Sequence, residues 1–171
     1  MKQQLTEKHV THVQNASKMC LACGDDNPMS LHGQFLDLED GSICGLFTTK
    51  DEHQSYPGRV HGGIISAMLD ETIGRAVQTK WPEIFGVTME LKVKFRHPVP
   101  LGVPLKVIAH TDSHKGRVFD GTGQLVLEDG TVAAQGFARY YELKPDEIME
   151  QGLTDEMWHE DKRPAPSEIL A

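Results

Sequence analysis

The chain has 171 residues, of which 39% are apolar, a length and composition that fit one domain with one hydrophobic core. Its 25 acidic and 17 basic side chains give a formal net charge of -8, and this excess repels the phosphate backbone of nucleic acids. It contains no run of about 18 apolar residues that could cross a membrane, and the polar residues 1–18 lack the apolar core of a signal peptide. We therefore expect a cytoplasmic protein whose partners include neither nucleic acid nor a membrane.

The first part of the chain predicts two strands after a polar beginning. Residues 1–19 are polar and are expected to form an arm or a short helix, whereas 20–33 are rich in Gly, Asp, Asn and Pro, which indicates a loop. Side chains alternate over 34–39 as in a strand, and 42–49 fit a returning strand. Asp40-Gly41 between them is a hairpin signal.

One helix is predicted strongly, over His61–Lys80. Apolar side chains recur there at intervals of three and four residues, namely Ile64, Ile65, Met68, Leu69, Ile73, Ala76 and Val77. Trp81-Pro82 ends the helix, because the residue before a proline avoids helical backbone geometry. Since the helix is apolar on nearly every side, a large element must bury it.

Four further strands are predicted after the helix, over 86–97, 103–112, 116–128 and 131–143. Gly121 and Gly123 interrupt the third strand, which predicts a β-bulge at that point. Consecutive hairpins favour an antiparallel sheet, and a curved sheet wrapped around one long central helix buries both elements, which is an α+β fold. The acidic residues 145–171 predict an appended helix with a frayed end, so the chain divides into an arm (1–19), a domain (20–144) and a tail.

Three segments resemble a known family. HGGIISAMLDETIGRAV at 61–77, followed by GVTMELKVKFRHPVPLG at 86–102, is similar to the hotdog-fold thioesterases related to 4-hydroxybenzoyl-CoA and phenylacetyl-CoA thioesterases. CLACGDDNPMSLHG at 20–33 resembles a Cys-containing segment of some members. The resemblance covers about residues 20–142. It implies a hotdog fold, hydrolysis of an acyl-CoA without a cofactor, and sites at the interfaces of a homodimer or a dimer of dimers.

The predicted helix begins with a feature suited to acyl transfer. A helix N-terminus offers unpaired N–H groups and the positive end of a dipole, which stabilise a developing oxyanion. Gly62 and Gly63 stand at this position, and because glycine has no Cβ, a thioester carbonyl can approach their backbone closely. His61 before them either binds the substrate carbonyl or orients the turn.

Asp70 is the candidate catalytic carboxylate, as a nucleophile or as the general base that activates water. Asp is a poor residue for a helix interior, and seven residues make about two turns, so Asp70 shares a face with Gly63. Ser66, Ala67 and Gly74 on this face are small. They leave room for a ligand or a second chain.

The spacing predicts a site shared between two subunits. Seven residues separate Gly63 from Asp70 by roughly 10 Å along the helix axis, whereas a reacting carbon needs its oxyanion donor and its attacking group each within about 3 Å. An antiparallel helix of a second subunit, related by a two-fold axis, would bring its Asp70 to this Gly63.

Other candidates come from the resemblance. Thr88 matches a position where some relatives place a hydroxyl near the attacking water, and Arg96 and His97 match basic residues near the CoA phosphates. Ser66 is a candidate for substrate contact, although a helical serine is often simply packed. Each of these residues also has an ordinary structural interpretation.

Three alternatives use other chemistry. Cys20-x-x-Cys23 is half of a zinc signature that His9-x-x-His12 would have to complete, and its loop-like context argues against a redox motif; we expect no metal. A hydroxyacyl-thioester dehydratase of the same fold would need a catalytic histidine, for which His53 is the nearest candidate. A non-hydrolytic acyl-CoA-binding protein would keep the pocket without turnover.

Overall fold

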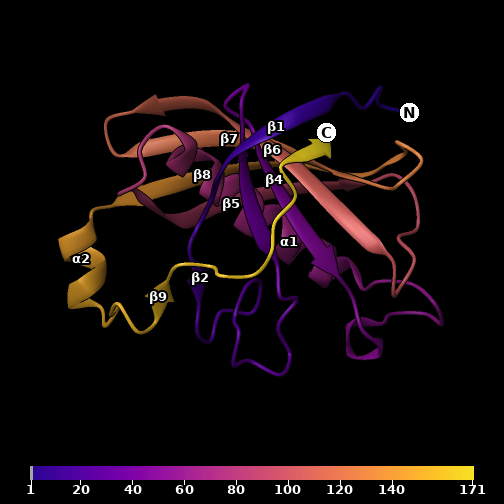
Figure 1. The fold of residues 1–171 in the computed structure, drawn as a ribbon, viewed down its shortest axis with the longest axis horizontal. Coiled ribbons are helices and arrows are strands. Elements are labelled where there is room, and N and C mark those ends of the chain that lie inside the picture. The colour runs from indigo at the N-terminus through magenta and orange to yellow at the C-terminus, as the bar shows by residue number, and fades with distance from the viewer. Residues whose placement is uncertain (1) are drawn as a thin grey trace.

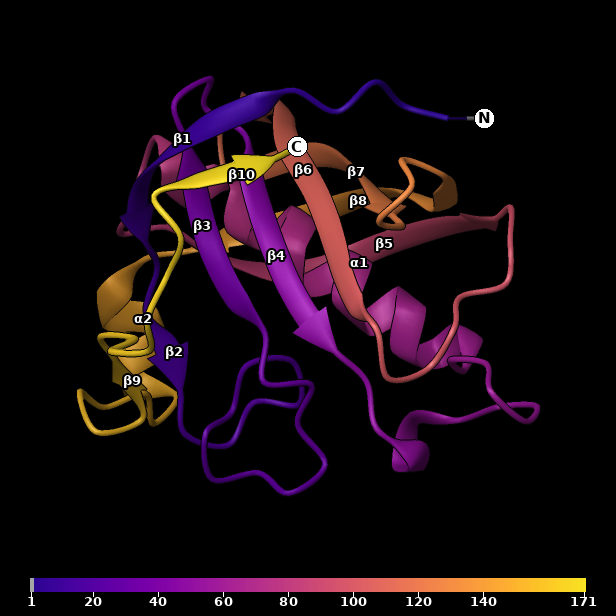
Figure 2. The ribbon, with the colours of Figure 1, turned by 45° about the vertical axis from the view of Figure 1, so that its right-hand side comes forward.

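The computed structural model describes residues 2–171 and consists of a curved antiparallel sheet folded around one long helix (Figure 1). The helix, α1, spans Gly62–Arg75 and continues as a 3-10 turn over Ala76–Thr79. In Figure 2, β3, β4 and β6 pass in front of α1 while β5 lies behind it. The predicted α+β hotdog architecture is confirmed.

Eight strands form the main sheet in the order β10-β1-β3-β4-β6-β7-β8-β5. Their bounds are Glu7–Val13 (β1), Gln34–Leu38 (β3), Ile43–Thr48 (β4), Phe85–Phe95 (β5), Pro104–Lys115 (β6), Val118–Val126 (β7), Val132–Leu143 (β8) and Glu168–Leu170 (β10). Two short strands, Ala16–Ser17 (β2) and Trp158–His159 (β9), pair separately. The six strands predicted between 34 and 143 are all present, and the strand pairings are antiparallel throughout.

Three glycines of β7 and β8 allow α1 to lie directly on the sheet. A Cβ at Gly121, Gly123 or Gly136 would stand 2.7, 2.8 or 2.9 Å from the side chain of Ile73, which is fully buried. Burying such a side chain contributes about 1.5–3 kcal/mol. The prediction of a bulge in β7 at these glycines is wrong. In the β6–β7 pairing, the register shift lies in β6, between Thr111 and Ser113.

Both ends of the chain join the main sheet. β1 pairs with β3 and with β10, and Val10 and Val13 help to cover a second apolar cluster on the sheet face opposite α1. Ala171 belongs to that cluster and is 2% exposed. The expectation of an arm or helix is thus wrong for 7–13, and so is the frayed end, although the appended helix exists as α2, Pro145–Glu150. The domain boundaries themselves remain a prediction.

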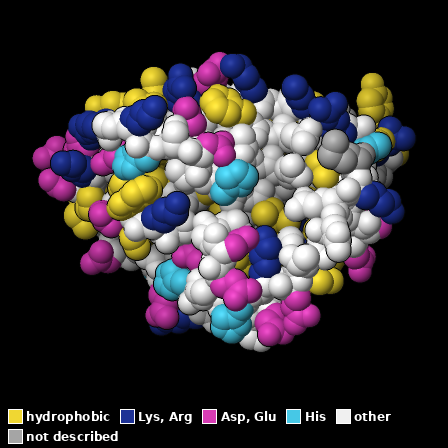
Figure 3. Space-filling view, turned by 90° about the horizontal axis from the view of Figure 1, so that it is seen from above, with side chains coloured by type: hydrophobic (Ala, Val, Ile, Leu, Met, Phe, Trp, Pro, Cys, Tyr) yellow, Lys and Arg dark blue, Asp and Glu magenta, His cyan; other side chains and the backbone are white. Residues whose placement is uncertain are grey.

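Charged side chains of both signs are interspersed over the surface seen in Figure 3, and no large region of that face carries a single sign. Within residues 2–171, no helix has the length and apolar character needed to cross a bilayer. An anionic ligand therefore has to be recognised by a local group of basic side chains, because the formal net charge is -8.

Candidate active site

His61 caps the N-terminus of α1. Its backbone is extended (φ -66°, ψ 139°), and its Nδ1 accepts a hydrogen bond of 2.9 Å from the N–H of Gly63. A neutral imidazole whose Nδ1 accepts carries its proton on Nε2, so His61 presents an N–H donor to the exterior. The Gly63 N–H is therefore occupied by the cap, whereas the Gly62 N–H has no backbone acceptor among residues 2–171.

A hollow of about 310 Å³ opens beside this helix end. Gly62 and Ile65 of α1 line it together with Phe95, the last residue of β5. Its wall is basic, with the predicted Arg96 and His97 and, in addition, Arg59. The structure thus brings the Gly62 turn, Arg96 and His97 together.

Asp70 lies about two turns further along the same face of α1 and is half-buried. Its Oδ1 accepts hydrogen bonds from the hydroxyl of Thr88 (2.9 Å) and from that of Tyr140 (3.3 Å). Burial raises the pKa of the Asp70 carboxyl, the two hydroxyl donors act in the opposite direction, and the charge of Glu71 raises it further. The result is a poorly solvated carboxylate held in one orientation, which suits a general base or a nucleophile.

Tyr140 is a site residue that the sequence did not reveal. Its ring is buried against Phe119 with the planes nearly parallel, and its hydroxyl also donates to the backbone carbonyl of Asp70 at 2.7 Å. A Cβ on Gly74 would stand 3.0 Å from this ring. The space beside Gly74, expected for a ligand or a second chain, is therefore filled from β8. The alternation of ARYYEL, which turns Tyr140 inward, was the available signal.

Two other candidates have local structural partners. The hydroxyl of Ser66 donates to the carbonyl of Gly62 at 2.9 Å, within the same helix. His53 is buried, with its Nδ1 accepting from the Lys50 N–H and its Nε2 3.1 Å from the carbonyl of Met29. Because both ring nitrogens of His53 are engaged, this histidine is poorly suited to acid–base chemistry.

The two cysteines of the CxxC segment lie against α1. Their sulfurs and the carboxylate of Glu71 are within 4.8 Å of one another. His9 and His12 belong to β1, where they face Glu168 and Asp37 in the strand pairing. The histidine pair therefore does not complete a four-ligand site with the cysteines in residues 2–171.

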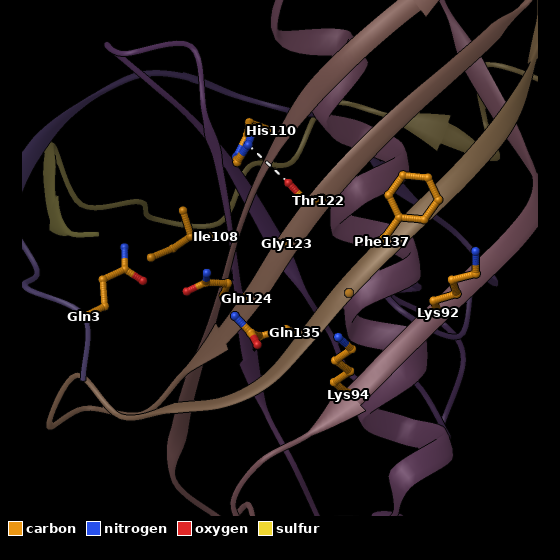
Figure 4. Close-up of a pocket in the computed structure, with 11 residues that line it drawn as sticks. Gln3, Lys92, Lys94, Ile108, His110, Thr122, Gly123, Gln124, Gln135 and Phe137 are labelled. Carbon is orange, nitrogen blue, oxygen red and sulfur yellow. Dashed lines mark hydrogen bonds between the residues drawn. The ribbon is translucent and has the colours of Figure 1, made fainter. Parts of the chain in front are cut away.

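A larger hollow, about 540 Å³, lies on the sheet face opposite α1 (Figure 4). Lys92 and Lys94 of β5 point toward it, with Gln135 and Phe137 of β8 and His110 of β6. The sheet separates this hollow from Asp70. It does not contain the predicted catalytic residues.

Comparisons with known proteins place the chain in a family. The family model described as "Thioesterase superfamily" matches residues 57–134. A putative esterase of Saccharolobus solfataricus is 30% identical over 116 residues, covering 64% of this chain and 77% of that protein. The chain belongs to the thioesterase superfamily. An acyl-coenzyme A thioesterase of Rattus norvegicus, named THEM4, is 27% identical over 116 residues, which cover 67% of this chain and 49% of that one.

Solved structures of the superfamily share the fold. A thioesterase superfamily protein is 29% identical with a TM-score of 0.62, covering 69% of this chain and 57% of its own. A putative thioesterase from Ralstonia eutropha, described as related to phenylacetic acid degradation, is 27% identical with a TM-score of 0.58 and coverages of 65% and 85%. The chain spans 37%, 51% and 49% of the length of three curated relatives that it matches.

Proposed function

We propose that the protein hydrolyses an acyl-CoA thioester to a free acid and CoA, with Asp70 as the general base or the nucleophile. The observation that carries this proposal is the half-buried Asp70 carboxylate, fixed by Thr88 and Tyr140 and with a raised pKa. In the general-base form, Asp70 takes a proton from water while the oxygen attacks the thioester carbon. The carbonyl oxygen gains negative charge, and the C–S bond then breaks to release the CoA thiolate.

The N-terminus of α1 is the proposed oxyanion site. Gly62 offers a backbone N–H, and the Nε2–H of His61 is a second donor beside it. In this assignment His61 both orients the turn through Nδ1 and donates to the substrate through Nε2. Gly63 then contributes by holding the imidazole, unless substrate binding frees its N–H for the carbonyl oxygen.

The path of β5 supports a site built by two subunits. β5 is the last strand of the sheet order, and Val87, Met89 and Phe95 are exposed on it. Thr88 near its start contacts Asp70, whereas Phe95 at its end lies against the Gly62 turn. Antiparallel pairing of two β5 edges, with the two-fold axis near the middle of the strand, would place Thr88 of one subunit opposite Phe95 of the other. That arrangement would bring Asp70 to the partner's Gly62 turn and would also cover an exposed edge.

Basic residues at the hollow favour a CoA ester over a neutral thioester. Arg59, Arg96 and His97 line the wall beside Gly62, in a protein whose overall charge is negative. Guanidinium groups bind phosphate oxygens through paired N–H donors. We assign this wall to the phosphates of CoA.

The test is release of free thiol from a panel of short-chain, long-chain and aromatic acyl-CoAs. Turnover of at least one of them that disappears in Asp70→Asn supports the proposal. Tight acyl-CoA binding with no turnover would instead identify a non-hydrolytic binding protein. Full turnover by Asp70→Asn would remove Asp70 from the mechanism.

A further inference from the structure

A second reactive cluster lies where the 20–33 segment meets α1, and the proposed hydrolysis does not use it. Cys20 is half-buried, Cys23 is fully buried, and both are free thiols. Glu71 directly follows Asp70 in the helix, yet its carboxylate lies with the two sulfurs, all within 4.8 Å. Two thiols and a carboxylate that can accept a proton are therefore close together.

The 20–33 segment is a loop, as its composition predicted, and it begins with a closed turn around the two cysteines. The N–H of Gly24 donates to the carbonyl of Cys20 at 2.8 Å, which makes one helical turn of residues 20–24. A Cβ at Gly24 would stand 2.4 Å from that carbonyl oxygen, so the turn requires glycine here. Residues three apart on such a turn lie on the same side, about 5–6 Å apart at Cβ. A disulfide needs only a modest tightening of this separation.

The two sulfurs have different protonation behaviour. A hydrogen bond from the Cys23 thiol lowers the pKa of Cys20 to about 7, against burial and the charge of Glu71, which raise it. The Ala22 N–H also donates to the Cys20 sulfur at 3.3 Å. The pKa of Cys23 is raised, first by that bond to Cys20 and then by burial. When protonated, Cys20 directs its S–H to Glu71 at 3.9 Å, so a proton acceptor is at hand.

Arg75 supplies a positive charge for the second sulfur. Its guanidinium is buried, with Nη2 3.1 Å from the Cys23 sulfur and Nε 2.8 Å from a Glu71 oxygen. Once Cys20 is bonded to another sulfur, it is no longer a thiolate that accepts the hydrogen bond of the Cys23 thiol. The adjacent guanidinium then favours the Cys23 thiolate.

We propose that Cys20 and Cys23 form a redox-active dithiol that exchanges with a low-molecular-weight disulfide, RSSR, with Cys20 as the attacking and Cys23 as the resolving residue. The Cys20 thiolate forms a bond to one sulfur of RSSR, and the departing RS⁻ takes a proton. Cys23 loses its proton to Glu71 or solvent, its sulfur bonds to that of Cys20, and the second RS⁻ leaves. The dithiol is oxidised to a disulfide while RSSR is reduced to two RSH.

A metal site at the same atoms is the competing assignment. Cys20, Cys23 and Glu71 would provide three ligands within the described chain. Arg75, however, already holds the Cys23 sulfur and a Glu71 oxygen through hydrogen bonds, and a cation would stand beside its guanidinium. This arrangement stabilises a thiolate and disfavours a dication.

The experiment treats the reduced 171-residue chain with glutathione disulfide and follows intact mass and peptide maps. We expect the wild type to become two hydrogens lighter through a Cys20–Cys23 bond, and Cys23→Ser to retain one glutathionyl group on Cys20. Cys20→Ser should react at least about tenfold more slowly, since the remaining thiol of the pair, Cys23, is fully buried and out of reach of the disulfide.

Cys44 provides the matched control, because it is buried in β4 and burial raises the pKa of its thiol to about 12. Cys44→Ser should behave as the wild type. Equal reaction rates of the wild type and Cys20→Ser would overturn the proposal. So would glutathionylation confined to Cys44, or stoichiometric zinc in the reduced protein that protects both thiols.

Discussion

The two candidate parts of the site on α1, the Asp70 carboxylate and the N-terminus at Gly62, differ in how many of their hydrogen-bond partners come from the same chain. At the Asp70 end, Thr88 and Tyr140 of the same chain already hold the carboxylate, and Gly74 lets the Tyr140 ring lie against the helix. At the N-terminal end, the Gly62 N–H and the Nε2 side of His61 have no hydrogen-bond acceptor within residues 2–171, and the Gly62 turn lies beside a basic hollow. Under the proposed function, the attacking group would be assembled on folding, whereas the oxyanion and phosphate sites would be completed by substrate and a second subunit.

The largest expected effect comes from removing the carboxylate. Asp70→Asn should lower kcat by at least about 100-fold, the usual size of a general-base contribution, because the amide keeps an oxygen for Thr88 and Tyr140 but cannot accept the proton. The folded-state pKa of Asp70 is raised, so ionising it costs stability as pH rises above the unfolded-state pKa. The variant should therefore melt at the same or a higher temperature at neutral pH. A large fall in Tm would mean that Asp70 is structural.

Subunit mixing tests whether the helix N-terminus of one subunit and Asp70 of the other form one active site. Asp70→Asn retains a good helix N-terminus, and Gly63→Pro retains a good carboxylate but loses the N–H that the His61 cap uses. Random exchange should restore up to about a quarter of wild-type activity, because half of the dimers are mixed and each has one intact site.

The controls are circular dichroism and light scattering on each variant, to establish that Gly63→Pro folds and associates. Exchange itself is followed with differently tagged chains. If mixed dimers form and activity stays at the level of the parents, both groups belong to one chain and the shared-site assignment fails.

The hydroxyl donors around Asp70 should have an intermediate effect. Tyr140→Phe keeps the ring against Phe119 and Gly74 but removes the bonds to Asp70, and kcat should fall several-fold. The donors lower the carboxyl pKa, so removing one should raise it and move the acidic limb of kcat/KM to higher pH. Thr88→Val should shift it in the same direction. An unmoved limb in both variants would argue that Asp70 does not titrate in catalysis.

The smallest expected effect is at the cysteines. Because Cys20 and Cys23 contact Glu71 and Arg75 but not the Asp70 carboxylate, Cys20→Ser with Cys23→Ser should keep thioesterase activity within a few-fold under reducing conditions. The assay is the same thiol release, with product measured by chromatography to avoid interference from the reductant. Loss of activity together with loss of bound zinc would contradict both this expectation and the prediction that no metal is bound.

Periodicity predicted the central elements well because burial imposes it. Helix α1 and strands β3, β4, β6, β7 and β8 contain buried apolar residues, and β5 packs the partly buried Leu91 and Val93 against the same core, so apolar residues recur at the helical or strand interval. β1 was missed because EKHVTHV has few apolar residues: its exposed positions are polar, and Val10 and Val13 are only partly buried, against a cluster drawn from distant parts of the chain. Its pairing with β10 joins residues about 160 apart, which no local pattern encodes.

Sequence reasoning selected Gly62 and Asp70 from their positions along the helix, and the family resemblance supplied Arg96 and His97. Sequence reasoning missed a candidate residue whose position depends on packing. Tyr140 reaches Asp70 only because β8 pairs with β5 and curves under the helix. The cap formed by His61 was one of two roles that the sequence allowed, and it changes which N–H remains available.

The contact between Ile73 and the three glycines beneath it has a consequence for evolution and for library design. A methyl group at position 136 would meet the Cδ1 atom of Ile73, which valine lacks. Removing the Cδ1 methyl of Ile73 makes room for a methyl group at position 136. Gly136→Ala should therefore be far less destabilising in combination with Ile73→Val than alone. At 121 the nearest atoms include the Cγ2 of Ile73, which valine retains, and a backbone oxygen. No substitution of Ile73 by valine relieves the contact at Gly121. Among functional variants we therefore expect position 121 to remain glycine, and substitutions at positions 73 and 136 to occur together.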